Sequence, residues 1–366
     1  MRPELIYQLA LTLIPNIGPV QAKLLLQHYD AAGIFKARKS ELEKIEGIGA
    51  IRASSIKAFS DFSEAEKEIR FLEKFRIRPL FITDPDYPAR LLNCFDSPTM
   101  LFYKGSANLN HGRVISVIGT RNNTEYGKQF TEQLIKDLAD QDVLVVSGLA
   151  FGIDAIAHKQ ALKNNLQTIG VLAHGLDQLY PGQHTGLARE MIKAGGGLLT
   201  EFRSNTKPDK HNFPTRNRVV AGMSDATIVI ETGEKGGSII TAELANGYNR
   251  DVFAVPGRTN DPKSAGCNAL IRNNKAVLLT AAQDLVELLN WDVRKKSLSK
   301  QQKELFIDLS SEEKIIMSIL RGKNSVHIDE INLRSGLSSS SVAAAILNLE
   351  LQNVVLSLPG KVYQVT

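Results

Sequence analysis

The sequence predicts an α/β protein with three parts: a helical N-terminal domain, an extended Rossmann-like domain with a doubly wound, mostly parallel sheet, and a C-terminal winged-helix domain. Two similar glycine-containing passages lie near the start of the chain. Short apolar runs alternate with helical segments after Val114, and three helix-like segments followed by a hairpin pattern come last. Alternating strands and helices build a parallel sheet, which binds ligands beyond the carboxyl ends of its strands.

The N-terminal passages are "LIPNIGPVQAKLLLQHY" and "KIEGIGAIRASSIKAF". Each has an apolar residue and a short turn before Ile-Gly and a helix-like continuation. This is typical of a helix-hairpin-helix, in which backbone N–H groups can reach a nucleic-acid phosphate, with Gly18 and Gly49 as the residues of closest approach. Such hairpins also serve as packing modules, so both roles remain open. We expect a helical domain of helix-hairpin-helix or SAM-like type over residues 1–75.

A connector is expected over residues 62–110, with a polar helix from Ser63 to Lys74 and then the proline turns of "TDPDYPARL" and "DSPTM". The Rossmann-like domain is assigned to residues 76–292. Its strands are apolar runs that are rich in β-branched residues and show little polar alternation, as buried strands do. They are "VISVIG", "VLVVSG", "TIGVLA", "GLLTEF", "TIVIE" and "VFAVPG".

Unusual residues come directly after several of these strands. They form the stretches "GTRNNTEYGK", "SGLAFGIDAIAH", "AHGLDQLYPGQH" and "ETGEKGGSIITAE". Because the carboxyl ends of parallel strands share one rim of a sheet, we expect these stretches to converge there. In the last of them a helix is expected to open at Ser238, and the N–H groups at a helix start attract an anion.

Basic residues support a phosphate-binding rim. Arg121 directly follows a strand, and "KPDKHNFPTRNRVVAG" gathers further basic residues around Phe213: Lys207, Lys210, His211, Arg216 and Arg218. Arginine offers a fork of donors to phosphate oxygens, and an aromatic ring offers a stacking face to an unpaired base. The pattern therefore favours a rim that binds phosphate groups and that offers an unpaired base a ring.

Several of the charged residues also have a structural interpretation. Arg216 and Arg218 can pair inside the fold with carboxylates such as Glu201 or Glu231, and we expect one of the two arginines to do so. Asp154 and His158 in "GIDAIAH" are four residues apart, a spacing that could serve acid-base chemistry. Asp154 fits equally well as a helix cap, and His158 is expected to be a hydrogen-bonded packing residue.

Several other classes of protein are disfavoured. The stretch "VIGTRNNTEYG" lacks the GxGxxG turn of a dinucleotide site, and no GxxxxGK[ST] occurs. The cysteines, Cys94 and Cys267, have no CxxC or His-rich neighbourhood, so we expect no disulfide framework and no metal site. No apolar stretch reaches membrane length, and the first residues lack a cleavage site. The net charge of +5 is compatible with a polyanionic partner, and we expect a cytoplasmic protein.

The C-terminal region begins with a basic, polar linker, assigned to residues 293–309. Helices are expected over residues 312–321, 327–335 and 338–352, followed by a hairpin that turns at Pro359 and Gly360. This order predicts a winged-helix domain over residues 310–366. The third helix carries no Lys or Arg, so we expect this domain not to bind DNA through it. Its apolar positions Val342, Ile346 and Leu349 are expected to face the domain's own core.

Together these motifs resemble the DprA/Smf family of DNA-processing proteins. The motifs are "VIGTRNNTEYG", "SGLAFGIDAIAHKQAL", "GLDQLYPGQH", "FPTRNRVVAGMSDATIVIE", "GGSIITAELANGYNRDVFAVPG" and "GCNALIRNN". The resemblance implies a protein of natural transformation that binds and protects single-stranded DNA, forms a homodimer, helps to load the recombinase RecA, and has no catalytic step and no cofactor.

The resemblance also implies roles for particular residues. The DNA-binding residues would be Arg121, Lys210, Phe213, Arg216, Asn217, Arg218, Gly237 and Ser238. The dimer interface would include Leu270, Ile271 and Val277. The sequence departs from the family at His184, where the family usually has Asn, and at Thr185, where several members have a basic residue.

An enzyme is the alternative. Lysine-decarboxylase-like proteins cleave a nucleotide N-glycosidic bond on a similar sheet, and they use a glycine-rich turn followed by a Glu, which "GGSIITAE" with Glu243 resembles. The usual Pro-Gly-Gly start of that turn is Glu-Lys-Gly-Gly here. A nucleotide hydrolase also has no need of hairpin and winged-helix flanks, so DNA binding is the preferred interpretation.

Overall fold

The computed structural model describes residues 4–291, 309–321 and 325–365. The chain separates into two compact units, Met1–Ala282 and Gln283–Thr366, and each is described by itself. The linker expected over residues 293–309 lies outside the described residues except for Leu309. Within the described residues, no helix is long and apolar enough to cross a membrane.

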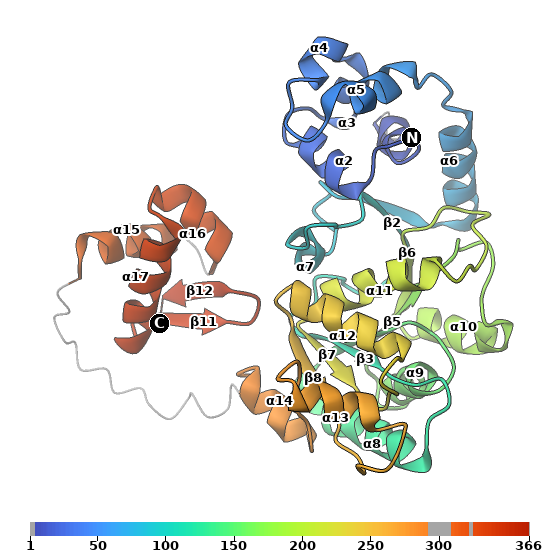
Figure 1. Ribbon diagram of the computed structural model, residues 1–366, viewed down its shortest axis with the longest axis vertical. Helices are drawn as coiled ribbons and strands as arrows, with labels where there is room; N and C mark the ends of the chain where they lie inside the picture. Colours follow the sequence, from blue (N-terminus) through green and yellow to red (C-terminus); the bar gives the residue numbers. More distant parts are fainter. Residues whose placement is uncertain (1–3, 292–308, 322–324, 366) are drawn as a thin grey trace. The chain divides into compact units, whose positions relative to one another are not determined.

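The first unit begins with short helices (Figure 1): α1 Leu5–Leu11, α2 Pro19–Leu26, α3 Ala31–Lys36, α4 Lys39–Leu42, α5 Gly49–Ala58 and α6 Ser63–Phe75. Each of the two repeated passages contains a turn followed by a helix, which is α2 in the first and α5 in the second. Arg52 joins their turns, because its Nε donates to the backbone oxygen of Asn16 at 3.3 Å and its Nη1 donates to that of Gly47 at 3.0 Å. Arg52 therefore links the turns of the two passages.

A sheet of nine strands forms the centre of this unit, in the order β1-β2-β6-β5-β4-β3-β7-β8-β9. Neighbouring strands from β6 to β9 in this order are parallel, and β2 pairs antiparallel with both β1 and β6. The strands are β1 Arg78–Phe81, β2 Met100–Gly105, β3 Val114–Ile118, β4 Leu144–Ser147, β5 Thr168–Leu172, β6 Gly197–Thr200, β7 Ala226–Val229, β8 Asp251–Ala254 and β9 Val277–Leu278. The predicted doubly wound, mostly parallel sheet is confirmed.

The expected connector over residues 62–110 is only partly irregular. Its helix α6 is present, but β1 and β2 extend the sheet through this segment. The flanking proline turns hid a short edge strand and the buried run Met100–Gly105. Strand β9 was also missed, since two residues are too few for a periodic signal.

Helices connect the strands: α7 Ala89–Leu92, α8 Glu125–Asp137, α9 Ile153–Lys163, α10 Thr185–Lys193, α11 Asn212–Gly222, α12 Gly237–Gly247 and α13 Ala265–Arg272, with 3-10 turns η1 Ala139–Gln141 and η2 Gly182–His184. Helix α14 Ala282–Leu288 follows β9 and belongs to the second unit from Gln283 on. Helix α8 packs on α9, and α11 packs on α12. Strands β3, β4 and β5 are buried along their whole length, which is why their sequences are almost entirely apolar. The direction of strand order reverses between β3 and β7, and ligands of doubly wound sheets bind at such a switch point.

The second unit contains the predicted winged helix. Its elements are α15 Ser311–Leu320, β10 Val326–His327, α16 Ile328–Ser335, α17 Ser339–Leu351, β11 Val355–Leu358 and β12 Val362–Val365. Ser310 and Ser338 cap α15 and α17, since each hydroxyl accepts a hydrogen bond from the third N–H of its helix. Val342, Ile346 and Leu349 are buried in the core of this unit, as expected.

Candidate nucleic-acid interface

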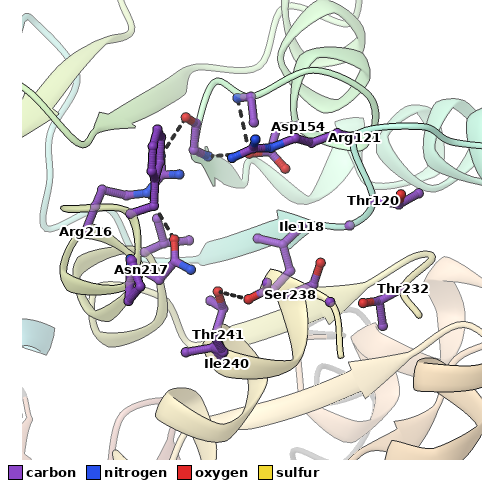
Figure 2. A pocket seen from close by; sticks show the side chains of 18 of the residues that line it. Ile118, Thr120, Arg121, Asp154, Arg216, Asn217, Thr232, Ser238, Ile240 and Thr241 are labelled. Atoms are coloured by element: carbon purple, nitrogen blue, oxygen red, sulfur yellow. Dashed lines mark hydrogen bonds between the residues drawn. The ribbon is translucent and has the colours of Figure 1, made fainter. Parts of the chain in front are cut away.

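A cavity of about 720 Å³ opens at the carboxyl rim of the sheet, where the strand order reverses. Residues after β3, β4 and β7 line it, together with residues of α11 and α12. Figure 2 shows side chains from these elements around the hollow, with Arg121 and Asp154 on one side and Ser238 and Thr241 on another. The predicted convergence of the motifs on one rim is therefore found. We call this hollow the rim cavity.

The structure brings all but one of the predicted DNA-binding residues to the rim cavity. Those that line it are Arg121, Lys210, Phe213, Arg216, Asn217, Gly237 and Ser238. Arg218 is not among the lining residues. The cavity thus combines cations, an aromatic ring and the start of a helix, which is the set of groups that a phosphate chain with unpaired bases requires.

The aromatic part of the cavity contains a second ring that the sequence analysis missed. The Arg121 guanidinium lies 5.3 Å from the centre of the Phe213 ring, and the Tyr180 ring lies 6.2 Å from that of Phe213. Tyr180 is 48% exposed and also lines the cavity. Its backbone N–H donates to Nε2 of His174 at 3.1 Å, which fixes the start of its loop. The signal in the sequence was its position in "GLDQLYPGQH", directly after the apolar run that forms β5.

Arg216 supplies a buried positive charge to the floor of the cavity. Its Nη1 donates to the backbone oxygens of Gly148 and Val171, and its Nε donates to Oδ1 of Asn217 at 3.1 Å. Burial lowers the pKa of Arg216 to about 10, and the nearby Asp154 carboxylate acts in the opposite direction. These protein acceptors hold the guanidinium in place. Because they occupy several of its N–H groups, Arg216 acts on a ligand mainly through its charge.

Asp154 is the buried counter-charge. Its Oδ2 accepts hydrogen bonds from the N–H groups of Gly148 at 3.0 Å and Ala150 at 3.4 Å (Figure 2). Burial raises the pKa of Asp154, and Arg216 opposes this effect. These contacts hold the loop after β4 against the floor arginine, so Asp154 has a structural task at the cavity.

Arg218, which the sequence analysis placed among the DNA-binding residues, lies outside the lining of the rim cavity. Two helical residues separated by one point about 200° apart around the axis, so Arg216 and Arg218 cannot face the same cavity. Arg218 forms ion pairs with Glu201 and, at 3.6 Å, with Asp96. Its side chain is only 10% exposed. As expected, one of the two arginines pairs with a carboxylate inside the fold, and that arginine is Arg218.

The start of α12 forms another part of the cavity wall. Gly236 precedes the helix in an extended conformation, and a Cβ there would lie 2.2 Å from Oγ1 of Thr232. A Cβ on Gly237 would meet nothing within 4 Å, so this turn is open toward the cavity. The first N–H groups of a helix have no partner within the helix and favour an anion.

His158 is a packing residue, as expected. It is fully buried, and its Nδ1 lies 2.6 Å from Oγ1 of Thr168. Thr168 donates its own hydroxyl proton to the oxygen of Val145, so Nδ1 of His158 carries the donated proton and Nε2 is the titrating atom. Among the residues that the structure describes, none forms a hydrogen bond with Nε2, and burial lowers the pKa of this imidazole to about 3.

The predicted dimer residues differ in their exposure. Leu270 is 3% exposed and belongs to the core of its own unit, so its side chain is not available at the surface. Ile271 is partly buried, whereas Val277 and its neighbour Leu278 are 44% and 45% exposed. The last two residues form β9, which is an edge strand of the sheet. Leu270 and Ile271 differ in burial because consecutive residues lie on different faces of α13.

Comparison with protein families gives two matches. The model of the family described as DNA recombination-mediator protein A matches residues 78–290, and the model described as DprA winged helix domain matches residues 303–361. Protein Smf of Synechocystis is 33% identical over 399 residues, covering 99% of this chain and 98% of that protein. DNA processing protein DprA of Bacillus subtilis is 42% identical over 214 residues, covering 58% of this chain and 71% of that protein.

Solved structures agree with these matches. DNA processing protein A from Streptococcus pneumoniae superposes with a TM-score of 0.66 and 31% identity, covering 78% of this chain and 98% of that chain. DNA processing protein A from Helicobacter pylori, described for its single-stranded DNA binding mode, gives a TM-score of 0.54 and 32% identity, covering 60% of this chain and 97% of that chain. Since the first family model spans more than half of the chain and the Synechocystis protein aligns over nearly all of it, this chain belongs to the DNA recombination-mediator protein A family, whose members are also called DprA or Smf.

Proposed function

We propose that this protein binds single-stranded DNA in the rim cavity as a DNA-processing protein of transformation and recombination. The observation that carries the proposal is the meeting of Arg121, Lys210, the Phe213 and Tyr180 rings and the start of α12 in one cavity. The Helicobacter pylori relative, described for single-stranded DNA binding, supports the same ligand.

Each group has a distinct task in this proposal. Exposed Lys210 and the N–H groups at the start of α12 contact backbone phosphates, while buried Arg216 and its neighbour Asp154 form the floor of the cavity. Phe213 and Tyr180 offer faces to unpaired bases, and Arg121 covers Phe213 until a base takes its place or stacks on the guanidinium. Duplex DNA hides its base faces, so it can use only the phosphate contacts.

The protein is proposed to act by binding, in the cytoplasm, without a catalytic step. The lysine-decarboxylase-like alternative needs its glutamate at the glycine-rich turn. Glu243 does not line the rim cavity, and its carboxylate forms a surface ion pair with Lys275 at 3.0 Å. Incubation with AMP or inosine monophosphate is expected to release no free base; release of base would support the enzyme.

Protection of the strand and delivery to RecA complete the proposal, and a homodimer is its expected form. The exposed edge strand β9, with Val277 and Leu278 next to Ile271, supports the dimer surface. An unpaired strand edge with apolar side chains is a ready site for a second chain. Ile271→Glu combined with Val277→Glu is expected to halve the mass in light scattering while a short oligonucleotide still binds.

A gel-shift comparison of single-stranded and duplex DNA at matched salt tests the main function. We expect tighter binding of the single strand, with a salt slope of about −0.7 for each phosphate neutralised. Equal affinity for the two forms would reject the proposal, because phosphate contacts alone would then account for binding.

A further inference from the structure

A second cavity, of about 770 Å³, opens on the same unit and has no role in the function proposed above. We call it the flanking cavity. Its lining comes from the start of α8 and from the loop after β8: Thr124, Glu125, Tyr126, Pro256, Gly257, Arg258, Asp261 and Ser264. Both segments follow parallel strands, so this cavity lies at the same carboxyl rim as the rim cavity.

The two cavities lie next to each other. Residues 120–124 begin in the lining of the rim cavity and end in the lining of the flanking cavity. Glu231 holds both ends of this short loop: its backbone oxygen accepts from the N–H of Thr120 at 2.7 Å, and its carboxylate accepts from the N–H of Thr124 at 2.8 Å. One buried residue thus separates the two hollows.

The other wall is shared in the same way. Thr232 and Gly233 line the rim cavity. The backbone oxygen of Thr232 accepts from the N–H of Gly266 at 2.9 Å, and a Cβ on Gly233 would lie 3.6 Å from the oxygen of Pro262. Gly266 and Pro262 flank Ser264, which lines the second hollow. The segment that follows β7 therefore contacts the segment that lines the flanking cavity.

The chemistry of the flanking cavity suits another part of the same ligand. The Tyr126 ring is 48% exposed, and its hydroxyl donates to the oxygen of Pro256 at 2.9 Å, so the ring is held in place while remaining accessible. Arg258 is exposed, and within the described part of the chain its guanidinium has no ion-pair partner. An anchored ring next to a free guanidinium offers one base a face and one phosphate a donor.

The two carboxylates of the flanking cavity are already engaged. Glu125 contacts Lys128 and Gln129 along its own helix, each at 3.3 Å. Asp261 accepts from the N–H of Lys263 at 2.9 Å and from the Ser264 hydroxyl at 3.2 Å. Lys128 offsets the charge of Glu125, and the two donors hold the Asp261 carboxylate in place. Both contacts reduce the repulsion between these carboxylates and a phosphate.

We propose that the flanking cavity is a second subsite on the path of the same single strand, in which a base stacks on Tyr126 and a phosphate binds Arg258. This inference rests on the proposed function. It predicts that a strand long enough to cross residues 120–124 gains affinity that a strand confined to the rim cavity lacks.

Fluorescence anisotropy with oligothymidylates of about 4 to about 20 nucleotides tests the subsite. For the long strands, Tyr126→Ala and Arg258→Ala are each expected to raise the Kd by about tenfold, since a stacked base or a charge-assisted contact is lost. The shortest strands, which fill only the rim cavity, are expected to bind as in the unaltered protein. Tyr126→Phe keeps the ring and is expected to retain long-strand affinity.

Arg189→Ala is the matched control, because Arg189 is an exposed arginine on α10 that lines neither cavity. If Tyr126→Ala fails to fold, Arg258→Ala at its exposed position still decides the matter. Unchanged affinity of both variants for every length would overturn the subsite, as would an equal loss for short and long strands. Failure of the proposed function gives a different result, because the unaltered protein would then not prefer single strands at all.

Discussion

The rim cavity and the third helix of the winged-helix unit are both places where a fold of this kind can hold nucleic acid, and they differ in every relevant side chain. The rim cavity is lined by Arg121, Lys210 and Phe213 and by the start of α12. Helix α17 has no Lys or Arg, and its outer face shows Leu347 and Leu351, which are 56% and 73% exposed. The comparison teaches that a fold offers a position for a ligand, and that the residues at the position decide whether one binds.

The two arginines of α11, two residues apart, also show that position decides the role of a side chain. Arg216 and Arg218 carry the same charge on the same helix. One forms the floor of the rim cavity, and the other completes a buried network with Glu201 and Asp96. Their charge alone does not tell which arginine serves DNA binding and which serves stability. Substitutions can tell the two roles apart, and the largest effect is expected on stability.

The largest effect is expected for Arg218→Ala. This substitution leaves Glu201 and Asp96 without their buried partner, which costs about 3–5 kcal/mol in the free energy of unfolding. Urea denaturation measures the loss. Arg121→Ala, at an exposed position, is the matched control and is expected to change stability by less than about 0.5 kcal/mol. Equal stability of the two variants would contradict the separate roles of these arginines.

The second effect is a loss of DNA affinity when the rim cavity is altered. Arg121→Ala and Phe213→Ala are each expected to weaken single-strand binding by about 1–3 kcal/mol, because a charge-assisted contact or a stacking face is removed. Titration by anisotropy, with a thermal melt of each variant, gives the answer. A collapse of thermal stability in either variant would mean that the residue is structural.

The third prediction concerns acid, and it applies to the sheet domain. His158 is neutral in the folded state down to about pH 3, while the unfolded chain binds this proton below about pH 6.5. Its contribution to stability is therefore lost as the pH falls from 6.5 toward 3, by about 1.4 kcal/mol for each pH unit. Asp154 and Glu201, whose pKa values are raised by burial, act with the opposite sign.

A paired measurement isolates the histidine. The free energy of unfolding of His158→Gln is followed between pH 7 and pH 4. It is expected to fall less steeply than that of the unaltered protein, because the variant takes up about one proton fewer on unfolding. Parallel curves for the two proteins would show that His158 does not bear this dependence.

The smallest effect is expected on removal of the winged-helix unit. Truncation after Trp291 is expected to leave single-strand affinity within a factor of about three, which is less than 1 kcal/mol, because α17 has no cation for a phosphate. The same anisotropy assay applies. A truncated protein that stays folded and dimeric but loses most of its binding would reverse the comparison between the two regions.

Much of the architecture was predictable from the sequence. Buried parallel strands are continuous apolar runs, and the order of runs and helices determines a doubly wound sheet, so the strands from β3 to β8 were found. The hairpin helices and the winged helix have local signals of the same kind. Strands β1, β2 and β9 were missed because they are set among turns or are too short to show a pattern.

The site was predictable as a set of segments, and less so residue by residue. Ligands bind at the carboxyl rim, so the motifs after the strands had to meet. Which face of α11 carries Arg218 depends on the exact phase of the helix, and the partnership with Glu201 joins residues from separate elements. Tyr180 was missed because a single tyrosine in a loop carries no periodic signal. The burial of Leu270 was not foreseen because the sequence does not fix which face of α13 packs on the core.

The central claim is that the strand lies in the rim cavity with its bases on the aromatic rings. A photo-crosslinking measurement tests it most directly: a single strand carrying 5-iodouracil is irradiated with the full-length protein, and the crosslinked peptides are identified by mass spectrometry. The account predicts crosslinks to the peptides that contain Phe213 or Tyr180, and their loss when an unlabelled single strand competes. Crosslinks found only in the N-terminal hairpins or in the winged-helix unit would contradict it.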